Sequence, residues 1–180
     1  MNNPHSLLYT QPVLDFIAVC TEYCKSVEQP PRAMAQRRGH LTLLRRLLAL
    51  VYLRATLLPD VPETDGRAWH TVTEADYDYV RQQLSHLLGA ADTYLDTFRD
   101  DFRYADQPIA CSLSEDLADV YQSLRDLIET FRLEEEEAMA TALAAVADDF
   151  MTGWGAKLLS ALRALHDAAL QDDDNEEYPS

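Results

Sequence analysis

The chain has 180 residues, of which 47% are hydrophobic and 26% charged, a mixture typical of one soluble globular domain with a single core. Its formal net charge is −16, which argues against proteins that bind nucleic acid or an anionic membrane through bulk charge. We therefore predict no direct nucleic-acid binding and no membrane contact, and an acidic surface suited to basic partners.

The cysteines and the first residues of the chain bear on its location. Cys20, Cys24 and Cys111 form no C-x-x-C pair, and Cys20 and Cys24 are too few ligands for a zinc site alone. An odd number of cysteines without a disulfide pattern fits a reducing compartment. The first residues lack the basic and apolar stretches of a signal peptide. We predict a cytoplasmic protein without a metal or cofactor.

The first half of the chain is dominated by helical periodicity. A helix is predicted over residues 11–28, with Pro12 in its first turn and Pro30 beyond its end. Residues 32–40 are basic and fit either a loop or the frayed start of the next helix. The helix over 41–58 is apolar nearly all round, but arginines interrupt it too often for a membrane span. We predict that it is the central helix of a bundle.

A surface loop and a long helix are predicted next. Residues 59–70 are rich in Pro, Asp and Gly, as surface loops are. Thr73 and Asp76 resemble a capping box at the start of a helix over 74–98. Gly89 falls inside that helix, where we expect close packing against a neighbour rather than a break.

The clearest helical signal follows a predicted loop over 99–111. It covers residues 112–131, where seven apolar residues recur at intervals of three and four. These residues are Leu117, Val120, Tyr121, Leu124, Leu127, Ile128 and Phe131. Ser114 is the predicted N-cap, and Arg125 and Glu129 lie one turn apart on another face.

The last third of the chain predicts two more helices and an acidic tail. A helix over 134–151 begins with four glutamates, 134–137, which point in different directions and so cannot converge on one metal ion. The sequence Gly-Trp-Gly at 153–155 either breaks or kinks the helical path. We predict one helical domain over 11–170, followed by a disordered tail over 171–180. The fold class is therefore all-α, a bundle of five to six helices.

Three segments together resemble a known family. They are VTEADYDYVRQQL with DTYLDTF within 72–98, SLSEDLADVYQSLRDLIETF at 112–131, and GWGAKLLSALRALH at 153–166. They are similar to an uncharacterised bacterial family catalogued as a domain of unknown function, number 5063, and the resemblance extends over roughly 12–166. It implies a soluble bacterial helical domain, and it implies no reaction, cofactor or catalytic residue.

No established catalytic motif occurs in the sequence. The chain lacks the His-Glu-x-x-His and Glu-x-x-His metal patterns, a glycine-rich phosphate loop and a Gly-x-Ser-x-Gly elbow. The strongest polar cluster is Asp116 and Asp119, one turn apart, which Arg103 and Tyr104 from the preceding loop could join. His166 on the last helix is a further candidate for binding. A structural alternative remains open, in which Asp116 completes the helix cap and Asp119 is solvated.

These observations favour a function without catalysis. The first hypothesis is a helical adaptor or regulatory module that binds a basic or apolar surface of a protein partner. The alternative is a small-molecule or metal-dependent enzyme with a polar site near Asp116 and Asp119. A third hypothesis is an acidic mimic of nucleic acid, which requires carboxylates arrayed at phosphate-like spacing.

Overall fold

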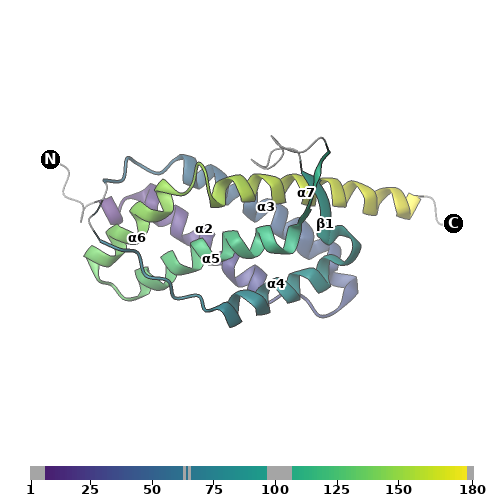
Figure 1. Ribbon diagram of the computed structural model, residues 1–180, viewed down its shortest axis with the longest axis horizontal. Coiled ribbons are helices and arrows are strands. Elements are labelled where there is room, and N and C mark those ends of the chain that lie inside the picture. Colours follow the sequence, from purple (N-terminus) through teal and green to yellow (C-terminus); the bar gives the residue numbers. More distant parts are fainter. Residues whose placement is uncertain (1–6, 63, 65, 97–106, 178–180) are drawn as a thin grey trace.

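A computed structural model describes residues 7–62, 64, 66–96 and 107–177 of the chain, with side chains up to residue 169. The regular secondary structure of the described part is helical apart from one small antiparallel sheet (Figure 1). Its elements are α2 (Gln11–Glu28), η1 (Met34–Gln36), α3 (Arg37–Thr56), α4 (Glu74–Leu88), η2 (Gly89–Asp92), β1 (Thr93–Asp96), β2 (Ile109–Ser112), α5 (Leu113–Arg132), α6 (Glu136–Asp148) and α7 (Trp154–Glu177). The predicted all-α bundle is confirmed.

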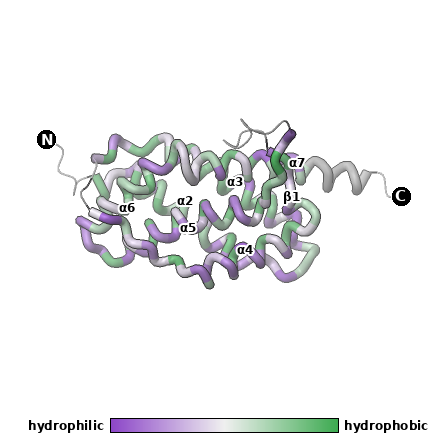
Figure 2. Tube along the Cα trace, viewed as in Figure 1, coloured by the Kyte–Doolittle hydropathy of each residue, from purple (hydrophilic) through white to green (hydrophobic). Residues whose placement is uncertain are grey.

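The helix boundaries follow local chemistry in two places that the sequence anticipated. Pro12 lies in the first turn of α2, where its missing N–H is not needed. Thr73 and Asp76 form the predicted capping box of α4, with the Thr73 hydroxyl accepting from the Asp76 amide at 3.2 Å. The basic segment over 32–40, for which the sequence allows either a loop or a helix, is partly helical, because η1 leads directly into α3 at Arg37. Hydrophobic and hydrophilic residues alternate along the helices (Figure 2), as amphipathic helices require.

The centre of the bundle is α5 rather than the predicted helix over 41–58. Helix α5 packs against α2, α4, α6 and α7, and Leu117, Leu124 and Leu127 on it are fully buried. Helix α3 covers that segment up to Thr56, but it packs mainly on α2 and α7 and leaves leucines such as Leu50 exposed. Its apolar composition therefore misled the prediction, because hydrophobic residues also occupy its outer face.

The predicted helix over 74–98 is wrong between Gly89 and Asp96, and residues 97–98 lie outside the described part of the chain. Gly89 ends α4 with a φ of 57°, in the left-handed region that favours glycine. Apart from the chain neighbours of Gly89, no atom of the described residues lies within 4 Å of the position that a Cβ there would take, so the close packing expected at Gly89 is not found among them. The chain then pairs β1 with β2, placing Tyr94 opposite Cys111 and replacing the end of the predicted loop over 99–111 with a strand.

The Gly-Trp-Gly sequence breaks the helical path. Helix α6 ends at Asp148 and α7 begins at Trp154, whose indole N–H donates to the Val146 carbonyl at 2.9 Å. A Cβ at Gly155 would lie 2.1 Å from the Phe150 carbonyl oxygen, so only glycine fits this turn. Helix α7 continues past the hairpin to Glu177 (Figure 1), so the structure is helical over 171–177, where disorder was predicted.

Candidate functional site

The structure describes three of the five predicted site residues, Asp116, Asp119 and His166. Asp116 and Asp119 lie on α5, whereas Arg103 and Tyr104 fall outside the described residues. His166 is exposed on α7 and makes no hydrogen bond or ion pair with any described residue. The described residues also contain no group of three possible metal ligands.

Asp116 is a buried residue and not the helix cap. Its side chain is 1% exposed, and its carboxylate accepts a hydrogen bond from the Tyr94 hydroxyl on β1. The N-cap is Ser112, whose hydroxyl accepts from the Glu115 amide at 3.3 Å, so the assignment of Ser114 was wrong. The Ser114 amide instead donates to the Asp92 carboxylate at 2.7 Å. Asp116 thus helps to attach the small sheet to α5.

Asp119 joins three helices and is not simply solvated. It accepts a hydrogen bond from the Tyr77 hydroxyl of α4 at 2.9 Å and from the Lys157 ammonium of α7 at 2.5 Å. Burial and the bonded Asp119 carboxylate raise the pKa of Tyr77, which keeps its hydroxyl protonated as a donor. With both donors in place, Asp119 is a structural link between α4, α5 and α7.

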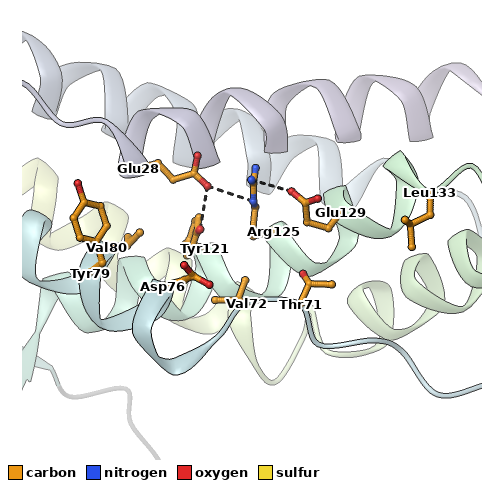
Figure 3. Close-up of a pocket in the computed structure, with 10 residues that line it drawn as sticks. All are labelled: Glu28, Thr71, Val72, Asp76, Tyr79, Val80, Tyr121, Arg125, Glu129 and Leu133. Atoms are coloured by element: carbon orange, nitrogen blue, oxygen red, sulfur yellow. Dashed lines mark hydrogen bonds and ion pairs between the residues drawn. The ribbon is translucent and has the colours of Figure 1, made fainter.

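A groove with a volume of about 500 Å³ lies elsewhere, between the end of α2, the start of α4 and the middle of α5. Figure 3 shows its lining, with Tyr79 at one end, Leu133 at the other and a row of ion pairs between them. The lining residues are Glu28, Thr71, Val72, Asp76, Tyr79, Val80, Tyr121, Arg125, Glu129 and Leu133.

The charged residues of the groove form one connected network. The Glu28 carboxylate accepts from the Tyr121 hydroxyl at 3.0 Å and pairs with the Arg125 guanidinium at 3.3 Å. Arg125 also pairs with Glu129 at 2.8 Å, and Arg132 at the edge pairs with the same carboxylate at 2.8 Å. Burial, followed by the neighbouring Glu28 charge, raises the pKa of Tyr121, so it remains a hydrogen-bond donor.

Asp76 adds a third carboxylate to the lining. Hydrogen bonds from Thr73 lower the pKa of Asp76, because they stabilise its charged form. Glu28, Asp76 and Glu129 therefore face a single arginine, Arg125, and the lining carries net negative charge. Fixed carboxylates of this kind can bind a cationic group, and Tyr79 offers an aromatic face at one end of the groove.

The apolar part of the groove is held in place by Asp126. Its buried carboxylate accepts from the amides of Thr71 at 2.7 Å and Val72 at 2.9 Å, and from the His70 ring at 3.1 Å. These bonds fasten the segment before α4 onto α5 and form one wall of the groove. Tyr79 and Leu133 remain more than half exposed along it, at 58% and 56%.

Sequence reasoning did not find this groove. The spacing of Arg125 and Glu129, one turn apart, is a local signal for one ion pair of the network, as is the spacing of Glu129 and Arg132 for another. Glu28 and Asp76 reach the same place from helices that end or begin there, and no spacing in the sequence predicts that meeting.

Comparisons with known proteins agree with the fold. A family described as "Domain of unknown function (DUF5063)" matches residues 8–171. The crystal structure of protein BF1032 from Bacteroides fragilis is similar at 30% sequence identity, with a TM-score of 0.78 over 91% of this chain and 98% of that chain. No curated protein matches the sequence. Since the family match covers most of the chain, the protein belongs to the family described as domain of unknown function DUF5063.

Proposed function

We propose that this protein is a non-enzymatic helical adaptor that binds a basic segment of a partner protein in the groove between α2, α4 and α5. The observation that carries the proposal is the groove itself, which combines three carboxylates with exposed Tyr79 and Leu133. Interfaces of this kind place aromatic and apolar anchors beside charges that select the partner.

The groove suits recognition better than catalysis. Arg125 is held by Glu28 and Glu129, so the network is a fixed electrostatic surface rather than a poised acid or base. In contrast, Asp116 and Asp119, the centre of the alternative enzyme hypothesis, are engaged by Tyr94, Tyr77 and Lys157. We extend the proposal to a cytoplasmic bacterial protein, supported by its three free cysteines and its Bacteroides relative.

A peptide titration tests the proposal. The probe is a fluorescently labelled synthetic peptide in which lysines and arginines alternate with leucines, and the readout is fluorescence anisotropy. We expect binding that weakens with added salt, because screening reduces the attraction of the three carboxylates. A matched peptide with glutamate in place of each basic residue should not bind in this groove.

The matched variants are Tyr79→Ala in the groove and Tyr9→Ala outside it. The two tyrosines are almost equally exposed, at 58% and 56%. Tyr79→Ala should weaken binding of the basic peptide by roughly tenfold or more, as loss of an aromatic anchor does, and should leave the melting temperature unchanged. Equal affinity in the two variants would overturn the proposal.

A further inference from the structure

The basic residues of this acidic protein are unevenly distributed. The segment over residues 29–59 contains six arginines and neither Asp nor Glu, although the whole chain has 15 basic and 31 acidic residues. The six are Arg32, Arg37, Arg38, Arg45, Arg46 and Arg54. All of the acidic residues therefore lie outside the segment that forms η1 and α3.

The outer face of α3 also carries exposed leucines. Leu43, Leu50, Leu53 and Leu57 are between 44% and 52% exposed. The spacing of seven and three residues places Leu43, Leu50 and Leu53 along one side of the helix, opposite the buried leucines that face α2 and α7. Leu57 is the C-cap residue directly after the helix and continues this spacing. We call this side, Leu43, Arg46, Leu50, Leu53 and Leu57, the outer face of α3.

Arg54 and Arg37 on α3 have structural roles. Arg54 pairs with Asp15 of α2 at 3.0 Å. Arg37 donates to the carbonyls of Leu87 at 2.8 Å and Leu88 at 3.1 Å, and so caps the end of α4.

Arg45 and Arg46 have no such task among the described residues. Neither makes an ion pair or a hydrogen bond through its side chain there, and Arg46 is exposed between Leu43 and Leu50. Single exposed leucines are ordinary, but a row of four on one helix side with a cation among them has the pattern of a docking surface.

We propose that the outer face of α3 binds an amphipathic helix of a partner protein, with apolar anchors flanked by acidic residues. The leucines would contact the anchors, and Arg46 with Arg45 would pair with the acids. From Leu43 to Leu57 the face extends about 21 Å, so the partner helix would make about four turns. The inference does not rest on the groove, which selects the opposite charge and uses other elements.

The charges on the protein disfavour two other occupants of the outer face of α3, a second copy of the chain and an anionic bilayer. A second copy docked face to face through α3 would bring Arg46 of one chain close to that of the other, and like charges are unfavourable there. An anionic bilayer would attract the arginines but repel the acidic residues that make up the rest of the surface.

A titration with two designed peptides tests the inference. The first is a labelled helical peptide with leucine at positions i, i+3, i+4 and i+7 and glutamate at its flanks, and the second has lysine at those flanks. We expect the acidic peptide to bind the intact protein and Arg46→Glu to weaken that binding roughly tenfold or more. Leu50→Ser should weaken it similarly, whereas Leu159→Ser, at an equally exposed leucine of α7, should not.

Several results would overturn the inference. They are no binding of the acidic peptide, unchanged binding in Arg46→Glu, or binding lost in Tyr79→Ala, which would place the peptide in the groove. Sedimentation with phosphatidylglycerol vesicles that requires Leu50 would assign the face to lipid instead. Tyr79 and Leu50 lie on different surfaces, so the two proposals fail independently. The groove proposal fails if Tyr79→Ala leaves binding of the basic peptide unchanged, and this inference fails if Leu50→Ser leaves binding of the acidic peptide unchanged.

Discussion

Among the single residues of this fold, Asp126 fastens the segment before α4 to α5. Its carboxylate receives two backbone amides and the Thr71 hydroxyl, so Asp126→Ala leaves those donors without their acceptor. We expect the free energy of unfolding, measured by urea titration, to fall by about 1–3 kcal/mol. The control Asp78→Ala removes a more exposed partner of Arg81 and should change it by about 0.5 kcal/mol or less. Equal losses in both variants would contradict this role.

His40 gives the fold a dependence on pH. Burial lowers the pKa of His40 below its usual 6.5, and its Nε2 atom has no hydrogen-bond partner among the described residues. As the pH falls through 6.5, the unfolded chain therefore takes up this proton before the folded chain does, and the folded state loses stability.

The comparison of two histidine variants isolates that effect. When the pH is lowered from about 7.5 to about 5.5, the melting temperature of the intact protein should fall by more than that of the His40→Asn variant. The exposed His86 serves as the control, and His86→Asn should follow the intact protein. A drop of the same size in His40→Asn would show that other groups cause it.

At the scale of elements, α5 carries the core. Leu124 is fully buried near the middle of the helix that contacts α2, α4, α6 and α7. Leu124→Ala should lower the free energy of unfolding by about 2–5 kcal/mol, because it leaves a cavity that the neighbouring helices cannot close. The exposed Leu159→Ala should cost far less, and a loss below about 1 kcal/mol for Leu124→Ala would be inconsistent with its position.

The sequence was sufficient to predict the helices but not all of their ends. Periodicity located α5 and the core position of Leu124, and capping chemistry located the start of α4. Periodicity failed after Leu88, because Tyr94 and Leu95 continue a helical spacing although they lie in a strand. Pairing of β1 with β2 involves residues far apart in the chain, and a local pattern does not contain that partner. Gly89 was the available signal, since glycine commonly ends helices.

The site was harder to predict than the fold, because its contacts form between elements that are distant in the sequence. Asp116 and Asp119 looked like a polar pocket because they share a helix flank, but neighbouring elements bring Tyr94, Tyr77 and Lys157 onto them. The groove differs from this pair of aspartates, because its carboxylates are not neighbours in the sequence. They meet only after α2, α4 and α5 have packed.

The contacts of Asp119 predict how the protein responds to divalent ions. Since Lys157 is paired with Asp119, binding of a metal there would have to displace a cation that the fold already provides. We expect magnesium, manganese, zinc and calcium to raise the melting temperature of the intact protein by no more than they raise that of the Asp116→Asn, Asp119→Asn double variant. A stabilisation of about 2.7 kcal/mol at a hundredfold excess over the dissociation constant, lost in the double variant, would support the metal-dependent enzyme instead.

We propose above that the groove between α2, α4 and α5 is the surface that binds a basic partner segment. It is tested most directly by mapping amide chemical shifts of the isotopically labelled protein during titration with the lysine- and arginine-containing peptide. We expect the largest changes to fall on residues lining the groove, among them Thr71, Tyr79 and Leu133. Changes centred instead on Asp116 and Asp119, or on the outer face of α3, would contradict it.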